Sequence, residues 1–315
     1  AFLRDRDALG ARSLRFGAGG VSGVLLSIGH GYCARALARR LSGENWRVIA
    51  TTRSAETAAA LARDGLDARL WPLADADGAL EEASHVLVSA PPGPDGDPAL
   101  AEMGDALTRA AGRLSWIGYL STTGVYGDHG GAWVDETTPV APSTERGRAR
   151  AAAEAGWLAL HDKHGASVHL FRLGGIYGPG RGPFGRIRAG AARRIVKPGQ
   201  VFGRIHVEDV AAVLRASMNA PAPGTAYNVV DDLPAPPEEP LAFAAELLGL
   251  PPPPAIAYDE AAAEMSPMAR SFYAESKRVS NARIKEALGV RLAYPTYREG
   301  FRAVLAAEDG DGATA

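Results

Sequence analysis

Hydrophobic residues in the first half of the chain recur in short runs that alternate with amphipathic segments. The run 24–28 predicts a buried strand, and a glycine turn separates it from a segment in which Ala36, Leu37 and Leu41 share one helical face. A second apolar run, "WRVIATTR" (46–53), precedes the alanine-rich "AAALARDGL" (58–66), which reads as a helix that ends at a glycine. The chain therefore begins with a strand–helix alternation.

The same alternation continues to about residue 178. Further strands are predicted at "ARLWPL" (68–73), "HVLVSAPPG" (85–93), "LSWIGYLST" (114–122) and "SVHLFRLGGIYG" (167–178), with helices at 99–111 and 149–164. Strands that alternate with helices imply βαβ crossovers and a parallel sheet covered on both faces. The predicted fold class is α/β, a Rossmann-type doubly wound parallel sheet.

The second half of the chain lacks this regular alternation and has proline-rich connectors around short helices. We expect a dinucleotide-binding core at 23–173, to which 201–233 returns, and a small C-terminal substrate lobe at 174–200 and 234–305. The last clear helix is predicted within "KRVSNARIKEALG" (277–289). Residues 1–22 read as a disordered leader and 306–315 as a loose tail.

The composition of the chain argues against several classes of function. The net charge is −2, so no global basic field favours nucleic acid, and no apolar run is long enough to span a membrane. The single cysteine, Cys33, cannot form an internal disulfide, which favours a reducing cytoplasm. The seven histidines show no metal-ligand spacing, and we expect no metal site.

The glycine turn after the first strand carries candidate chemistry. Gly29, His30, Gly31, Tyr32 and Ala34 belong to a G-x-G-x-x-A motif that follows a strand and opens a helix. In such a motif the glycines permit a tight turn and a close approach to a pyrophosphate, and the small last residue lets helix and strand pack. The motif predicts a dinucleotide site.

Two later strand ends bear on the cofactor. The second strand ends at Arg53 and Ser54, which offer hydrogen-bond donors to a 2′-phosphate where an NAD-binding site usually has a carboxylate. NADP is therefore the predicted cofactor, with NAD as the second choice. Ala90 and Pro91, at the end of the fourth strand, should lie over the middle of the cofactor.

Five segments, in order, resemble the extended and atypical short-chain dehydrogenase/reductases of the epimerase/dehydratase branch. They are "GHGYCA", "LSTTGVYGDHGGAWVDETTPVAP", "RLGGIYGPGR", "RIHVEDVA" and "YNVVDD". The resemblance implies a Rossmann core with a C-terminal lobe, NAD(P) in the sheet crevice, and chemistry on a small hydroxyl or carbonyl compound, often a nucleotide sugar.

The resemblance also assigns candidate catalytic positions. Thr122 matches the residue that holds the substrate oxygen, while Arg146 and Arg150 stand where the family has its tyrosine and lysine. Arg150 could still hold a ribose hydroxyl, but Arg146 cannot replace a phenol, because guanidinium stays protonated. Tyr126 is the stronger alternative for proton transfer. The dehydratases have an aspartate and a glutamate where this chain has Thr123 and Gly124, which argues against sugar dehydration.

A second tyrosine-x-x-x-lysine occurs at Tyr273 and Lys277. Its spacing would place both side chains on one helix face, either as a relocated acid/base pair or, the interpretation that we favour, as a surface pair.

Two functions from different classes remain open. One is an NAD(P)-dependent oxidoreductase or epimerase-like enzyme with a non-standard site, and the other is a non-catalytic NADP(H) sensor or metabolite-binding protein. The expected partner is a small molecule, and an anionic one would suit Arg146. The expected assembly is a monomer or homodimer.

Overall fold

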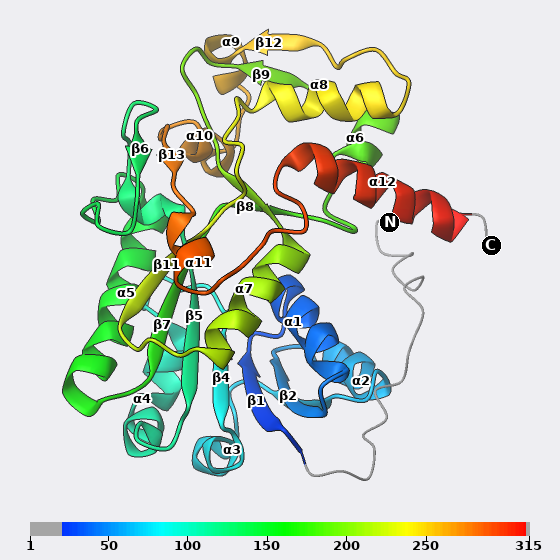
Figure 1. The fold of residues 1–315 in the computed structure, drawn as a ribbon. Coiled ribbons are helices and arrows are strands. Elements are labelled where there is room, and N and C mark those ends of the chain that lie inside the picture. The colour runs from blue at the N-terminus through cyan, green and yellow to red at the C-terminus, as the bar shows by residue number, and fades with distance from the viewer. Residues whose placement is uncertain (1–20, 313–315) are drawn as a thin grey trace.

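The computed structural model describes residues 21–312 of the protein. At its centre is a seven-stranded sheet in which all neighbouring strands pair in parallel (Figure 1). The strand order is β11 (Thr225–Val229), β7 (Val168–Leu173), β5 (Trp116–Thr122), β4 (His85–Val88), β1 (Gly23–Ile28), β2 (Trp46–Thr52) and β3 (Asp67–Leu70). The predicted α/β class with a Rossmann-type sheet is confirmed. The order reverses between β1 and β4, and open α/β sheets bind ligands beyond the carboxyl ends of the strands at such a position.

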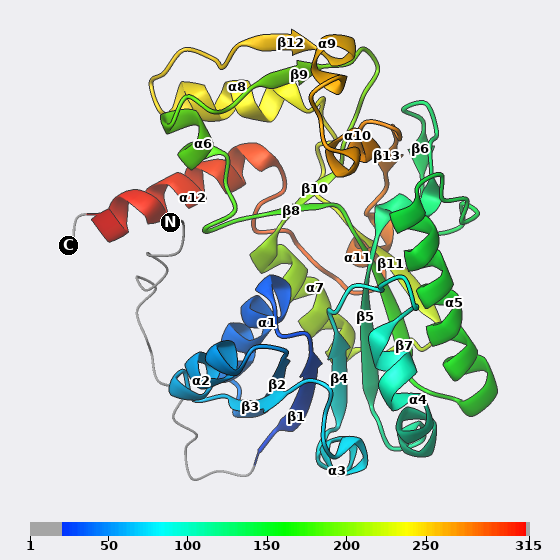
Figure 2. The same cartoon turned by 180° about the vertical axis from the view of Figure 1, so that it is seen from behind.

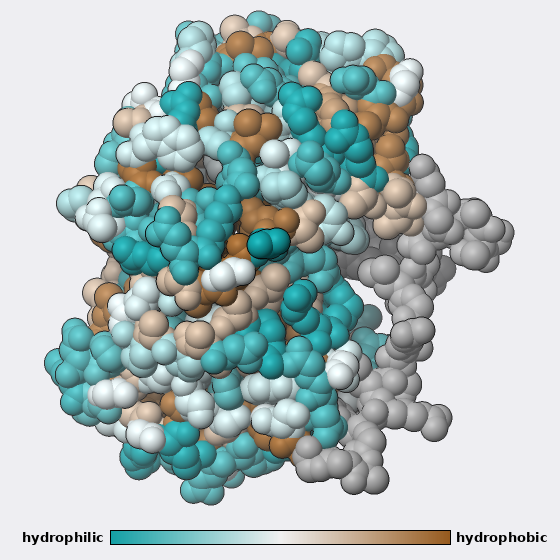
Figure 3. Space-filling view, viewed as in Figure 1, coloured by the Kyte–Doolittle hydropathy of each residue, from teal (hydrophilic) through white to brown (hydrophobic). Residues whose placement is uncertain are grey.

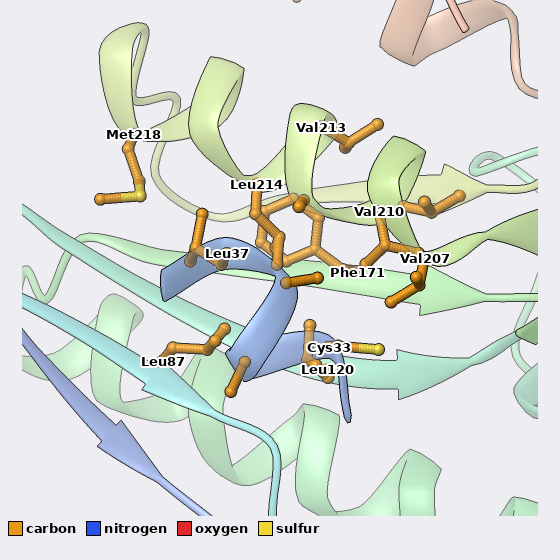
Figure 4. Packing of buried hydrophobic residues seen from close by; sticks show 14 of the residues in the cluster. Cys33, Leu37, Leu87, Leu120, Phe171, Val207, Val210, Val213, Leu214 and Met218 are labelled. Carbon is orange, nitrogen blue, oxygen red and sulfur yellow. The ribbon is translucent and has the colours of Figure 1, made fainter. Parts of the chain in front are cut away.

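Helices cover both faces of this sheet (Figures 1 and 2). Helices α1 (Tyr32–Ser42) and α7 (Val207–Asn219) pack on one face, and α3 (Ala76–Glu82), α4 (Pro98–Ala110) and α5 (Glu145–His164) pack on the other. Helix α2 (Ala55–Arg63) lies beside β2 and β3. Figure 4 shows Leu37 of α1 and Leu214 of α7 packed toward Phe171 of β7, and all three are buried. Burying each such side chain contributes about 1.5–3 kcal/mol.

A second group of elements lies above the sheet in Figure 1. It contains the paired strands β8 (Gly175–Tyr177) with β10 (Arg204–His206) and β9 (Arg194–Val196) with β12 (Ala255–Ala257). Its helices are α6 (Phe184–Arg188), α8 (Glu238–Leu247), α9 (Tyr258–Ala262), α10 (Pro267–Phe272) and α12 (Tyr297–Gly312). Phe184, Phe243, Tyr297 and Phe301 form a hydrophobic core of its own.

Several elements differ from the sequence-based predictions. Helix α5 begins at Glu145, four residues before the predicted start, because Thr144 caps it by accepting a hydrogen bond from the Gly147 amide. The segment 277–289 is not one helix: it forms β13 (Arg278–Val279), paired with β6 (Trp133–Val134), and the short α11 (Ala282–Glu286). Helix α3 was not predicted.

The C-terminal segment is more ordered than its sequence indicates. Helix α12 continues to Gly312 through part of the predicted loose tail, because Tyr297, Phe301 and Val304 bury one face of it and anchor the helix. At the other end of the chain, most of the predicted leader, residues 1–20, lies outside the described residues.

On the face seen in Figure 3, hydrophobic residues lie in small groups among hydrophilic ones. Between residues 21 and 312, no helix combines the length and the apolar character needed to cross a membrane.

The burial of His169, on β7, can be tested through the pH dependence of stability. Its ring is fully buried, accepts a hydrogen bond from the Ala222 amide at 2.9 Å and stacks on Trp116. Burial lowers its pKa from 6.5 to about 4. As pH falls, the imidazole of the unfolded chain therefore takes up a proton before the imidazole of the folded protein does. The free energy of unfolding should then decrease between pH 6.5 and 4, and this group contributes up to about 1.4 kcal/mol per pH unit.

We expect His169→Gln to flatten this pH dependence by roughly one proton, measured by urea unfolding at several pH values. Three other histidines whose pKa is lowered keep part of the slope: His30, His85 and His206. His164→Gln, at an exposed position, is the control. An unchanged slope in His169→Gln would contradict the assignment.

Candidate functional site

The glycine turn connects β1 to α1 at the reversal point of the sheet. Gly29 has φ of 75°, and its amide donates to Thr51 Oγ1 at 3.0 Å. A Cβ at Gly29 would lie 2.9 Å from the Ala90 amide nitrogen, so a side chain is excluded there. At Gly31, the N-cap of α1, a Cβ would meet only the Gly29 carbonyl, at 3.8 Å. The space in front of the α1 N-terminus is thus open, as a pyrophosphate requires.

Ala34 and His30 complete this turn. Ala34 is fully buried, which lets α1 pack against the sheet. His30 Nδ1 lies 3.0 Å from Ser27 Oγ, and its Nε2 has no hydrogen-bond partner among the described residues. Burial, followed by the charge of Arg35, lowers the pKa of His30 to about 4. The imidazole is therefore neutral at physiological pH.

Tyr32 ties the turn to the loop that follows β8. Its hydroxyl donates to the Pro179 carbonyl at 2.9 Å, and burial raises its pKa to about 12. The Arg181 guanidinium carbon lies 4.5 Å from the centre of the Tyr32 ring. This places a cation beside the first turn of α1. The motif "RLGGIYGPGR" was recognised in the sequence, but nothing in it indicated that its last arginine reaches Tyr32.

The two residues at the end of β2 have different surroundings. Ser54 caps α2, since its Oγ accepts from the Thr57 amide at 3.2 Å. Arg53 is exposed and forms no ion pair within the part of the chain that the structure describes. Its guanidinium is therefore available to an anion.

The end of β4 is close to the turn. The Ala90 amide donates to the Ile28 carbonyl at 3.2 Å, while the next residue, Pro91, is exposed. Ala90 therefore lies directly beside Gly29.

Thr122 ends β5 and caps the 3₁₀ turn η1 (Thr123–Tyr126). Its Oγ1 accepts from the Gly124 amide at 3.2 Å, and the residue is half-buried. The threonine hydroxyl keeps its own proton for a further hydrogen bond.

Helix α5 brings both of its candidate arginines to the same region. Arg150 is buried and donates to the Leu120 carbonyl at 2.5 Å and to the Tyr119 hydroxyl at 3.1 Å. Arg146, one turn earlier, has its guanidinium carbon 5.8 Å from the centre of the Phe272 ring of α10. The Arg146 side chain therefore extends from α5 toward α10, which belongs to the second group of elements.

Tyr126 does not fit the proton transfer that the sequence analysis assigned to it. The residue is fully buried, and its hydroxyl donates to Asn228 Oδ1 at 2.8 Å while accepting from Arg172 at 2.9 Å. Burial also raises its pKa. Both hydrogen-bonding directions are occupied inside the protein, so Tyr126 holds the η1 turn in place.

The second tyrosine–lysine pair also differs from its prediction. Helix α10 ends at Phe272, so Tyr273 and Lys277 do not share a helix face. Lys277 is buried and donates to the Gly127 carbonyl at 2.6 Å and to Glu275 Oε2 at 2.7 Å. It is not a surface residue.

Glu275 is a site residue that sequence reasoning missed. Its Oε1 accepts from the Ser143 hydroxyl at 2.6 Å. A Cβ at Gly124 would stand 3.5 Å from Thr122 Oγ1 and 3.9 Å from Glu275 Oε2, so both groups border one small space. The only signal in the sequence was the neighbouring Lys277, because a buried cation requires a partner.

The arrangement offers a turn for a pyrophosphate, a threonine hydroxyl, two arginines and a buried carboxylate–ammonium pair around the carboxyl ends of the strands. No group of three or more His, Cys, Asp or Glu side chains within residues 21–312 could hold a metal ion.

Comparison with known proteins places this arrangement in a family. Residues 101–230 match the model of the NAD dependent epimerase/dehydratase family. Protein YeeZ of Escherichia coli (strain K12) is 34% identical over 239 residues, which cover 72% of this chain and 84% of YeeZ.

Solved structures agree with the sequence comparison. A functionally unknown conserved protein from Silicibacter pomeroyi is 54% identical, with a TM-score of 0.86 over 91% of this chain and 99% of that one. MoeE5 in complex with UDP-glucose and NAD shares the fold at 20% identity, with a TM-score of 0.71 over 92% of this chain and 99% of its own. The chain belongs to the NAD-dependent epimerase/dehydratase family.

Proposed function

We propose that the protein binds NADP, with NAD as the second choice, and acts on a small hydroxyl or carbonyl compound. The observation that carries this is the open space at Gly31, at the N-terminus of a helix that follows the first strand. MoeE5 contains NAD, so the preference for NADP rests on Arg53. The single Cys33 favours the cytoplasm.

The cofactor and the substrate oxygen would be held by different parts of the crevice. Gly29–Ala34 receive the pyrophosphate, with Arg181 beside them, and Arg53 with Ser54 receives the 2′-phosphate. When bound, the nicotinamide supplies hydride transfer. Thr122 orients the substrate oxygen by donating its hydroxyl proton, and Ala90 with Pro91 limits the crevice on the other side.

Arg146 and Arg150 position other groups and do not transfer protons. Arg150 is held by Leu120 and Tyr119 near the end of β5, where a ribose hydroxyl could replace one of these acceptors. Arg146 stays protonated and can hold an anionic group of the substrate. Glu275 and Lys277, as a buried pair next to Thr122, are the titratable groups best placed to exchange a proton through that hydroxyl.

The occupied hydroxyl of Tyr126 favours a second candidate, a non-catalytic NADP(H)-binding protein. The two candidates differ in the fate of the cofactor. An enzyme oxidises NADPH when a carbonyl substrate is present, whereas a sensor releases it unchanged.

Arg53→Ala tests the cofactor assignment. We expect it to weaken NADP binding by roughly 1.5–3 kcal/mol, the range for a charge-assisted hydrogen bond, and to leave NAD binding almost unchanged. The measurement is isothermal titration with both cofactors. Arg63→Ala, at the other end of α2, is the matched control and should change neither affinity. Equal losses for NADP and NAD would show that Arg53 has only a structural role.

A further inference from the structure

Two of the three arginines of α5 have no anionic partner within the described residues. Neither Arg146 nor Arg150 forms an ion pair with any residue in 21–312, and the two acceptors of Arg150 are neutral oxygens. The Arg146 residue is exposed overall, yet partial burial of its guanidinium and the nearby charge of Arg150 lower its pKa. Two like charges one helical turn apart attract an anion.

An apolar surface faces this charge. Phe272 of α10, whose ring lies 5.8 Å from the Arg146 guanidinium carbon, is 52% exposed. Met268 stands one turn earlier on α10 and is 67% exposed. Residues four apart share a helix face, so both side chains border the same side of α10. Phe272 beside Arg146, with Met268 on the same side of α10, forms a surface for a ligand that has both a charged and an apolar part.

The anion would lie close to the reacting oxygen. Gly147, the residue after Arg146, packs so tightly on η1 that a Cβ there would be 2.8 Å from the Gly124 carbonyl. The Gly124 amide is in turn bonded to Thr122. Arg146 therefore begins the turn of α5 that packs on η1, the turn that Thr122 caps.

We propose that this surface accepts a small hydroxy or oxo acid with an apolar, ring-sized body, its carboxylate on Arg146 and its body against Phe272 and Met268. The inference rests on the proposed function, since Thr122 must hold the reacting oxygen. A nucleotide with a neutral sugar, such as UDP-glucose, fits less well, because it carries its charge only on the diphosphate outside the sugar ring.

Calorimetric titration of the NADP-loaded protein tests the proposal, with 3-phenyllactate as the probe. Lactate supplies the anion without the body, and 2-phenylethanol supplies the body without the anion. We expect 3-phenyllactate to bind at least about tenfold more tightly than either fragment, because both contacts contribute. Arg146→Gln and Phe272→Ser should each weaken it by about tenfold, and Arg146→Lys should weaken it less, because the charge remains.

Arg148→Gln is the matched control. Arg148 lies on the same turn of α5, but it is exposed and donates to the Ser143 carbonyl. Equal affinity of 3-phenyllactate and lactate, an equal loss in Arg148→Gln, or tighter binding of UDP-glucose that is unaffected by Arg146→Gln would each overturn the proposal. Failure of all probes with normal NADPH binding would also overturn it, while the cofactor part of the proposed function would stand.

Discussion

Gly31→Val is expected to weaken NADPH binding by at least about 100-fold, which corresponds to about 2.7 kcal/mol. The reason is steric. The new side chain points into the open space in front of α1, where the pyrophosphate must approach the helix N-terminus. Since Gly31 has a negative φ and its Cβ would meet no protein atom closer than 3.8 Å, the fold itself should tolerate the change. Titration of NADPH fluorescence measures the effect.

Gly43→Val provides the matched control, because Gly43 caps the other end of α1 and a Cβ there would meet no atom within 4 Å. This variant should bind NADPH normally. If Gly31→Val also binds normally while its thermal unfolding is unchanged, the cofactor lies elsewhere and the proposed function fails.

Glu154→Ala is expected to lower the free energy of unfolding by about 3–5 kcal/mol. Glu154 of α5 and Arg172 of β7 form an ion pair of 2.7 Å whose side chains are 4% and 7% exposed. Removing the carboxylate leaves a buried guanidinium without its charge partner, and Arg172 also supports the Tyr126 hydroxyl. Urea unfolding followed by tryptophan fluorescence gives the change in free energy.

Two further variants distinguish the effect of burying an ion pair from the effect of its charges on the free energy of unfolding. Arg109→Ala removes an exposed ion pair with Asp77 and should cost less than about 1 kcal/mol. The double variant Glu154→Leu/Arg172→Met replaces both charges by apolar groups and should be more stable than Glu154→Ala. A loss in Glu154→Ala no larger than that in Arg109→Ala would show that the buried pair does not hold α5 on the sheet.

The sequence alone determined the parallel sheet and the glycine turn. Strands and helices in βαβ order leave few alternative topologies, because crossovers are right-handed and short. The G-x-G-x-x-A motif is a local backbone requirement, so the positive φ of Gly29 and the open Gly31 follow from adjacent residues. The predicted helix 149–164 contains Arg150, whereas Arg146 lies one turn earlier on the same helix because the Thr144 cap starts α5 at Glu145.

Only the tertiary structure decided which side chains remain available for chemistry. The residues next to Tyr126 and Lys277 in the sequence give no sign that these side chains are buried. Tyr126 bonds to Asn228 and Lys277 bonds to Gly127, and both partners lie far along the chain. Glu275 lies near the Thr122 turn because its neighbours bond to residues far along the chain, Ser276 to Asp128 and Lys277 to Gly127, and such contacts leave no periodic signal. The environment of an ionisable group is set by packing at long range, which local patterns do not encode.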